Sequence, residues 1–190
     1  MTSFTTRRAA PAMAFAAAFT FPLSAAAQDE TAAYPAISGE LAIEIENDWT
    51  PSADDSDAEL NDLYTTTELG LSVALSHALS INGLFVLEPV EDPMDDRVFE
   101  DHGAYVDELY LRYDFGPAAV FGGKIHPTFG IAWDAAPGIY GVDFAEDYEL
   151  AEMIGGGVEV PFAAGGTDHI FTASVFFADT TFLRVRFKSL

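Results

Sequence analysis

The sequence contains no cysteine, and it has only 8 lysine and arginine residues against 31 aspartate and glutamate residues. The lack of cysteine excludes disulfide bonds, a thiolate metal site and a cysteine nucleophile. The shortage of basic residues leaves a formal net charge of −23. A field of that sign repels nucleic acid and attracts cations, so we expect no DNA or RNA partner.

Motifs of the common enzyme classes are also missing. The region before Lys124 departs from a phosphate-binding loop, because Ala118 and Ile125 stand where glycine and serine or threonine are needed. There is no GxSxG motif and no HExxH motif, and the histidines lie far apart, at His77, His102, His126 and His169. We therefore expect no catalytic residues, no cofactor and no metal site, and we do not predict an enzyme.

Residues 1–27 have the three parts of a secretory signal peptide: the basic pair Arg7 and Arg8, an apolar stretch at 9–23, and small residues at 24–27. The apolar stretch is shorter than the roughly 20 residues that a membrane-spanning helix needs. This pattern predicts export and cleavage rather than a retained anchor. The rest of the chain divides into a periplasmic linker, residues 28–38, and a β-domain, residues 39–190.

Apolar and polar residues alternate in short segments of that domain. In the clearest case, residues 39–46, Leu41, Ile43 and Ile45 alternate with glutamates. A period of two predicts β-strands with one apolar and one polar face. The strands are expected at 39–46, 65–75, 79–88, 105–115, 118–126, 154–162 and 169–178, with an eighth candidate at 181–188.

Three residues fall on the wrong side of this alternation: Leu84, Val86 and Asp107. In the segment 118–126 the alternation puts Ala119, Phe121 and Ile125 on the apolar face and Lys124 on the polar face.

The connections between the predicted strands alternate in length. Long connections at 48–62, 89–103 and 127–148 are separated by short ones at 76–78 and 116–117. Outer-membrane β-barrels have this asymmetry, with tight turns on one side of the membrane and longer loops on the other. The sequence therefore predicts an all-β fold, an antiparallel transmembrane β-barrel or a truncated part of one.

Two segments carry a resemblance to a known family. "ELYLRYDFGPAAVFGGKIHPTFG" at 108–130 and "YGVDFAEDYELAEMIGGGVEV" at 140–160 resemble the N-terminal portion of proteobacterial outer-membrane porins, including the phosphate-selective and related porin-like families. The resemblance extends over residues 39–181. It implies a water-filled channel for passive diffusion, built from more strands than this sequence supplies.

Two hypotheses account for the small number of strands. In the first, the chain is a truncated porin with a foreign tail. In the second, it is a closed eight-stranded barrel, in which basic residues near the C-terminus (Arg184, Arg186 and Lys188) lie opposite the glutamates of the first strand (Glu40, Glu44 and Glu46).

The expected function is passive diffusion of small hydrophilic solutes or ions across the outer membrane. The expected lumen-lining residues are Glu40, Glu44, Glu46, Glu68, Glu108, Arg112 and Lys124. By the resemblance, the third long connection narrows the channel and brings in Asp134, Asp143, Glu146 and Asp147. Rings of acidic residues favour cations, so we expect weak cation selectivity.

The expected partners are outer-membrane lipid, small solutes or ions, and further copies of the chain in a homo-oligomer. Two alternatives of other classes stay open. One is a small closed barrel with a structural or adhesin role, and the other is a soluble secreted β-sandwich that binds a ligand.

Overall fold

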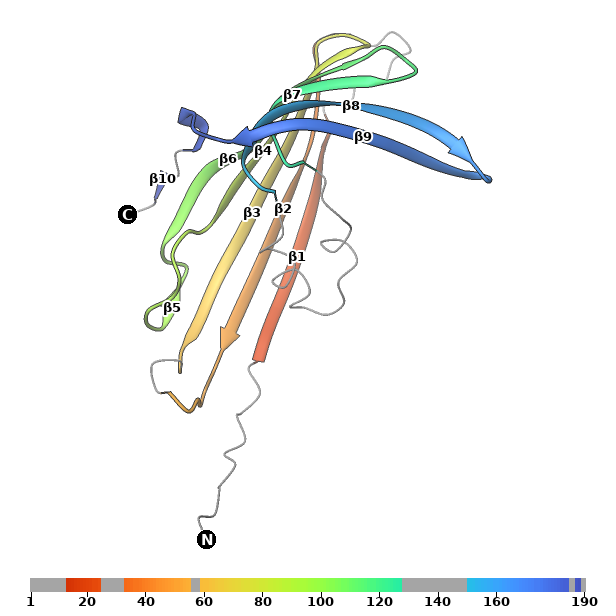
Figure 1. The fold of residues 1–190 in the computed structure, drawn as a ribbon. Coiled ribbons are helices and arrows are strands. Elements are labelled where there is room, and N and C mark those ends of the chain that lie inside the picture. The colour runs from red at the N-terminus through yellow and green to blue at the C-terminus, as the bar shows by residue number, and fades with distance from the viewer. Residues whose placement is uncertain (1–12, 25–32, 56–58, 128–149, 185–186, 189–190) are drawn as a thin grey trace.

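The computed structural model describes residues 13–24, 33–55, 59–127, 150–184 and 187–188 (Figure 1). Apart from one short 3-10 helix, the regular structure in these ranges is β-strand, as the alternation predicts. The elements are β1 (Met13–Ser24), β2 (Ala36–Trp49), β3 (Asn61–Ala74), β4 (Leu79–Pro89), β5 (Arg97–Val98), β6 (His102–Asp114), β7 (Ala119–Ile125), β8 (Met153–Ala164), β9 (Thr167–Ala178), η2 (Phe182–Arg184) and β10 (Phe187–Lys188).

The strands form one sheet. Its main path runs β1-β2-β3-β4-β6-β7-β8-β9, and each neighbouring pair is antiparallel. The two-residue strand β5 pairs in parallel with Asp62 and Leu63 at the start of β3. Each strand predicted between 39 and 178 is present, with ends that differ by a few residues. β2 starts at Ala36, inside the segment assigned to the linker.

Tight turns gather at one end of the sheet, because β3–β4, β6–β7 and β8–β9 are antiparallel hairpins with the same direction. Gly165 and Gly166 form the β8–β9 turn, both with positive φ (62° and 80°), the conformation that two-residue hairpin turns require. Gly116 has φ 92° in the β6–β7 turn, where its N–H donates to the Asp114 carboxylate at 2.7 Å. The predicted asymmetry of short and long connections is therefore confirmed for these hairpins.

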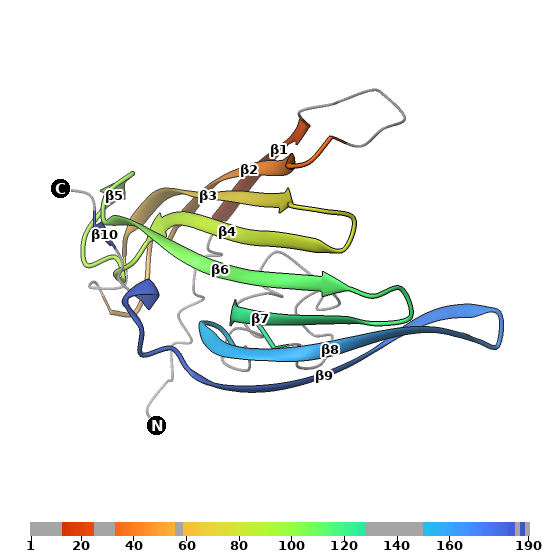
Figure 2. The same ribbon diagram turned by 90° about the horizontal axis from the view of Figure 1, so that it is seen from above.

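The sheet is open. In the described residues β9 has a neighbouring strand on one side only, and β1 and β9 lie at opposite ends of the curved sheet (Figure 2). The predicted strand at 181–188 is wrong. Its first part is the helical turn η2, and β10 pairs with Gly103 and Ala104 of β6 rather than with the first strand. The described residues therefore form an all-β antiparallel sheet that is not closed into a barrel.

The position of β10 follows from the shortness of β7. β7 pairs only with Leu109–Asp114 of β6, so the first half of β6 has an edge that β7 does not cover. β10 pairs with that edge.

Strand β1 lies within the predicted signal peptide. It pairs with β2 along its whole length, from Met13 opposite Trp49 to Ser24 opposite Ser38. Cleavage after residue 27 stays a prediction. Cleavage would make β2 the edge strand of the sheet.

The two faces of the sheet differ in chemistry. Residues opposite each other on antiparallel strands share a face. One row of such partners is Leu41, Leu69, Phe85 and Val106, and another is Val73, Ile81 and Leu111. These rows belong to the side that we call the apolar face. The other side, the polar face, carries Glu40, Glu68, Tyr110 and Arg112, among others.

The sheet has almost no conventional core. The buried hydrophobic residues in the described part of the chain are Val86, Ala119 and Ile125. Large apolar side chains are instead exposed on the apolar face; Leu111 is 52% exposed and Val175 is 80% exposed. The described strands thus form a single layer whose apolar face is uncovered.

A β-bulge explains the misplaced Asp107. The β4–β6 register shifts between Leu84, which faces Glu108, and Phe85, which faces Val106. Asp107 is therefore the additional residue on β6, and its side chain turns to the polar face, as bulges commonly redirect a side chain. Leu84 and Val86, the other two exceptions, also lie on the polar face by register.

The expected orientation of β7 is wrong. Phe121 pairs with Arg112 and lies on the polar face, with its ring centroid 6.3 Å from that of Tyr110 in an edge-to-face arrangement. Gly157 opposite Phe121 leaves room for this ring, because a Cβ there would lie 2.5 Å from it. Val120, on the other side of β7, is 41% exposed on the apolar face. Packing of one aromatic ring against another thus overrides the simple apolar–polar alternation.

Candidate functional site

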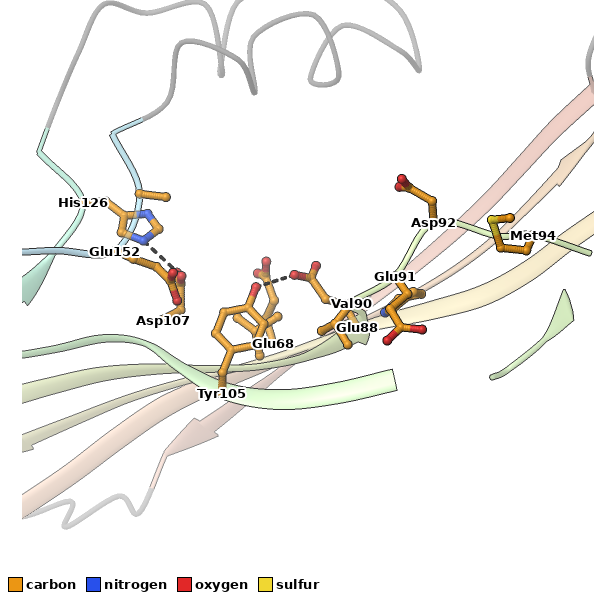
Figure 3. A pocket seen from close by; sticks show the side chains of 13 residues that line it. Glu68, Glu88, Val90, Glu91, Asp92, Met94, Tyr105, Asp107, His126 and Glu152 are labelled. Atoms are coloured by element: carbon orange, nitrogen blue, oxygen red, sulfur yellow. Dashed lines mark hydrogen bonds and ion pairs between the residues drawn. The ribbon is translucent and has the colours of Figure 1, made fainter. Parts of the chain in front are cut away.

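A cavity of about 850 Å³ lies against the polar face, over β3, β4 and β6 (Figure 3). Strand residues form its floor, and residues from the connections form its walls. The lining residues are Glu68, Val86, Glu88, Pro89, Val90, Glu91, Asp92, Met94, Tyr105, Asp107, His126, Ala151 and Glu152. We call this space the acidic cavity, because carboxylates dominate its polar lining.

The floor of the acidic cavity is a carboxylate array braced by a tyrosine. The Tyr105 hydroxyl donates a hydrogen bond to Glu88, and Glu68 lies beside them in the close-up (Figure 3). Glu68 is itself exposed, so its charge faces the open space. Such an arrangement attracts cations, since several like charges share one concave surface.

His126 brings the end of β7 to this floor. Its imidazole Nε2 lies 3.0 Å from Oδ1 of Asp107, the bulge residue, which is 8% exposed. The backbone N–H of His126 donates to the Glu108 carboxylate at 3.1 Å. Asp107 and Glu108, which form the bulge on β6, therefore both contact His126 just after the end of β7.

Arg97 fixes the connection that forms one wall. It donates from Nε to Oδ1 of Asp62 at 2.8 Å and from Nη2 to Oδ2 at 2.5 Å, and both side chains are 6% exposed. Its Nη1 also donates to the Glu91 carbonyl at 2.8 Å. The bonds to Asp62 raise the pKa of Arg97. This buried, bidentate ion pair holds the connection to the start of β3.

Lys124 lies apart from the cavity and is fully buried. Its Nζ donates to the carbonyls of Val106 at 2.6 Å and Leu183 at 3.3 Å, and to Oε1 of Glu152 at 3.2 Å. Oδ2 of Asp179 lies 3.7 Å away. Lys124 thus joins the open edge of β6 to the segments before β8 and after β9.

Asp179 is itself nearly inaccessible, with a side chain 1% exposed. Burial acts to raise the pKa of its carboxyl, but hydrogen bonds from Thr181 and the neighbouring charge of Lys124 outweigh that effect and lower the pKa overall. The Thr181 N–H donates to Oδ1 at 2.7 Å. Asp179 therefore stands as a carboxylate in this cluster.

Most residues expected to line a lumen lie on the polar face by register: Glu40, Glu44, Glu46, Glu68, Glu108 and Arg112. Glu40 and Glu108 border a second hollow of about 450 Å³. Arg112 forms an ion pair with Glu159 of β8. Lys124 does not line either hollow. Whether these residues line a lumen stays a prediction.

The residues expected to narrow a channel, Asp134, Asp143, Glu146 and Asp147, lie outside the described residues. Glu88, Tyr105, Asp107 and Glu152 line the cavity but were not predicted from the sequence. Asp107 had a usable signal, because a charged residue on the wrong side of an alternating strand is what a bulge produces. Glu152 had none, since it comes from a connection.

Comparison of the chain with known protein families, with curated proteins and with solved structures found no match. The described residues contain no cluster of three or more histidine, aspartate or glutamate side chains arranged to hold a metal ion. In the described part of the chain, no helix has the length and apolarity needed to span a bilayer.

Proposed function

We propose that the chain is a porin-like outer-membrane protein through which small hydrophilic solutes or ions diffuse passively, with a preference for cations. In this proposal the apolar face meets lipid and the polar face meets water. The protein is exported by its signal peptide, as the basic pair, apolar stretch and small residues at 1–27 predict.

The supporting observation is the contrast between the two faces. The rows that include Phe85, Leu111 and Val175 leave large apolar side chains accessible on one side of a single sheet. Removing one such side chain from water is worth about 1.5–3 kcal/mol, so a long uncovered row is costly in water and favourable in hydrocarbon. Strands with apolar residues outward and polar residues inward have the pattern of transmembrane barrels.

Within this proposal the open edges at both ends of the sheet need partners: β9 at one end and, after cleavage of the signal peptide, β2 at the other. In hydrocarbon, each N–H and C=O group without a hydrogen bond costs several kcal/mol, so membrane sheets close on themselves. Further strands, from other copies of the chain or from other polypeptide segments, therefore pair with both edges in the membrane.

The preference for cations rests on the charges of the polar face. Glu68 and Glu88 face the acidic cavity, whereas Arg112 is neutralised by Glu159 and Lys124 is buried. The accessible charge is therefore negative, and negative linings favour the passage of cations.

Reconstitution tests the proposal. The purified mature chain is mixed with liposomes and then exposed to protease, and its conductance is recorded in planar bilayers under a salt gradient. We expect a protease-resistant inserted species and a reversal potential of the sign that cation preference produces. A folded monomer in detergent-free buffer that does not insert would contradict the membrane assignment, and an anion-selective conductance would contradict the cation preference alone.

A further inference from the structure

Lys124, Glu152 and Asp179 form a cluster that solute diffusion does not require. They come from β7, from the connection before β8 and from the residue after β9. The Asp179 N–H donates to the Glu152 carbonyl at 3.0 Å, which ties the two acidic residues together through the backbone. One amine and two carboxyl groups are thus held together, with the amine at 0% exposure and the Asp179 side chain at 1%.

We propose that Lys124 and Asp179 join in the folded protein to form an intramolecular amide bond between Nζ and Cγ. The reacting groups are an amine and a carboxyl group 3.7 Å apart, measured from Nζ to Oδ2. Proximity of this kind replaces a bimolecular encounter, and exclusion of water prevents the reverse reaction, hydrolysis. This cross-link does not depend on the transport proposal.

The reaction is a condensation that balances without any further reagent. Glu152 takes a proton from the Lys124 ammonium, and the neutral nitrogen then attacks Cγ of Asp179. The N–C bond forms, the bond from Cγ to Oδ2 breaks, and Oδ2 leaves as water after receiving protons from Nζ by way of Glu152. No atom changes its oxidation state overall.

Glu152 and Thr181 are positioned to assist this reaction. Glu152 Oε1 lies 3.2 Å from Nζ, within reach of direct proton transfer. The Thr181 N–H, at 2.7 Å from Oδ1, stabilises the negative charge that develops on this oxygen during the attack.

Asp179 is the acceptor rather than Glu152 for two reasons. The Thr181 hydrogen bond polarises the Asp179 carboxyl group, and the Asp179 side chain is more completely buried than that of Glu152, which is 20% exposed. Because Glu152 contacts water, it can exchange protons with the solvent. Because hydrogen bonds keep the pKa of Asp179 low, its reactive neutral form is a minor one, and we expect the bond to form slowly after folding.

The bond would fasten β7 to the segment that follows β9. A covalent link between residues far apart in sequence restricts the unfolded chain and so stabilises the folded state. In this sheet it would secure the edge of β6 that β7 leaves uncovered, where the carbonyls of Val106 and Leu183 both contact Lys124.

Mass spectrometry of the denatured full chain tests the proposal, because an ion pair does not survive denaturation and an amide does. The purified folded protein is incubated and sampled over time beside a Lys124→Arg variant, which keeps the positive charge but lacks the amine. We expect the wild type to lose the mass of one water molecule and the variant to lose none. Digestion with trypsin and a glutamate-specific protease cuts the chain between the two residues, so a branched peptide that contains both the Lys124 and the Asp179 segments identifies the bond.

Two further variants separate chemistry from folding. Glu152→Gln keeps both reacting residues but removes the proton carrier, so we expect much slower mass loss. Glu159→Gln, a matched change in the separate ion pair with Arg112, should leave the rate unchanged. A wild-type chain that keeps its full mass after prolonged incubation overturns the proposal, as does a link from Lys124 to Glu152.

Discussion

At the scale of single residues, ion pairs in this sheet differ mainly in burial. The Arg97 and Asp62 side chains are each 6% exposed, whereas those of Arg112 and Glu159 are 33% and 28% exposed. Burial strengthens the attraction but makes the loss of one partner costly, because the remaining charge stays desolvated. A surface-accessible pair contributes little, since water screens it.

Arg97→Ala should therefore destabilise the protein strongly. The buried Asp62 carboxylate would lose both hydrogen bonds, and we expect a loss of about 3–5 kcal/mol in the free energy of unfolding. The matched variant Arg112→Ala should cost about 1 kcal/mol or less. Urea unfolding of the lipid-reconstituted protein measures both, and equal losses would contradict the ranking.

Glycine positions allow a second comparison of residues. At Gly157 a Cβ would lie 2.5 Å from the Phe121 ring and 2.6 Å from the Ala173 carbonyl oxygen, whereas at Gly70 the nearest contact is 3.9 Å. Gly157→Ala should cost about 1–3 kcal/mol through overpacking. Gly70→Ala should be close to neutral. Urea unfolding also measures these two variants, and a tolerated Gly157→Ala would mean that both the Phe121 ring and the Ala173 backbone can shift.

At the scale of elements, each strand has an apolar and a polar face, and the bulge on β6 is the main irregularity of the sheet. The bulge brings Asp107 to the polar face, where it meets His126 at the end of β7. On β4, by contrast, the alternation is regular at Ile81 and Asn82. Ile81 is 36% exposed on the apolar face, and Asn82 accepts a hydrogen bond from Ser72 on the polar face.

Ile81→Cys and Asn82→Cys form a matched pair that tests which face meets lipid. The chain has no native cysteine, so each variant carries one labelling site. A polarity-sensitive dye on Cys at position 81 should emit as in hydrocarbon and be quenched by lipid-soluble quenchers. The dye at position 82 should respond to water-soluble quenchers instead. Equal responses at the two positions would argue against a membrane-spanning β4.

At the scale of the whole molecule, the accessible charge decides what passes along the polar face. The chain has 31 acidic residues and 8 basic ones, and among the basic residues Lys124 and Arg97 are buried in ion pairs. Mobile ions screen such a field over about 10 Å at 0.1 M salt and about 3 Å at 1 M. Selectivity should therefore depend on salt concentration.

The double variant Glu68→Gln and Glu88→Gln should move the reversal potential toward zero, because it removes two accessible charges from the acidic cavity. The control variant Asp54→Asn and Asp168→Asn changes two exposed carboxylates that do not line the cavity. We expect the wild-type preference for cations to fall between about 0.1 M and 1 M salt. A control that lowers selectivity as much as the cavity variant would place the relevant charges elsewhere.

The sequence by itself determined the strands between 39 and 178, the two faces of most of them (β7 is the exception) and the short turns between them. These features follow from local rules, because successive side chains of a strand point to opposite faces and glycine marks tight turns. Leu41, Ile43 and Ile45 show their face without reference to any other segment.

Only the tertiary structure decided how the segments meet. The bulge at Asp107, the polar-face position of Phe121, the burial of Lys124 and the pairing of β10 with β6 each depend on a partner distant in sequence. The open sheet has the same origin. The last strand, β10, pairs with an edge that no other strand covers. Because β7 is short, that edge lies on β6 and not on the first strand.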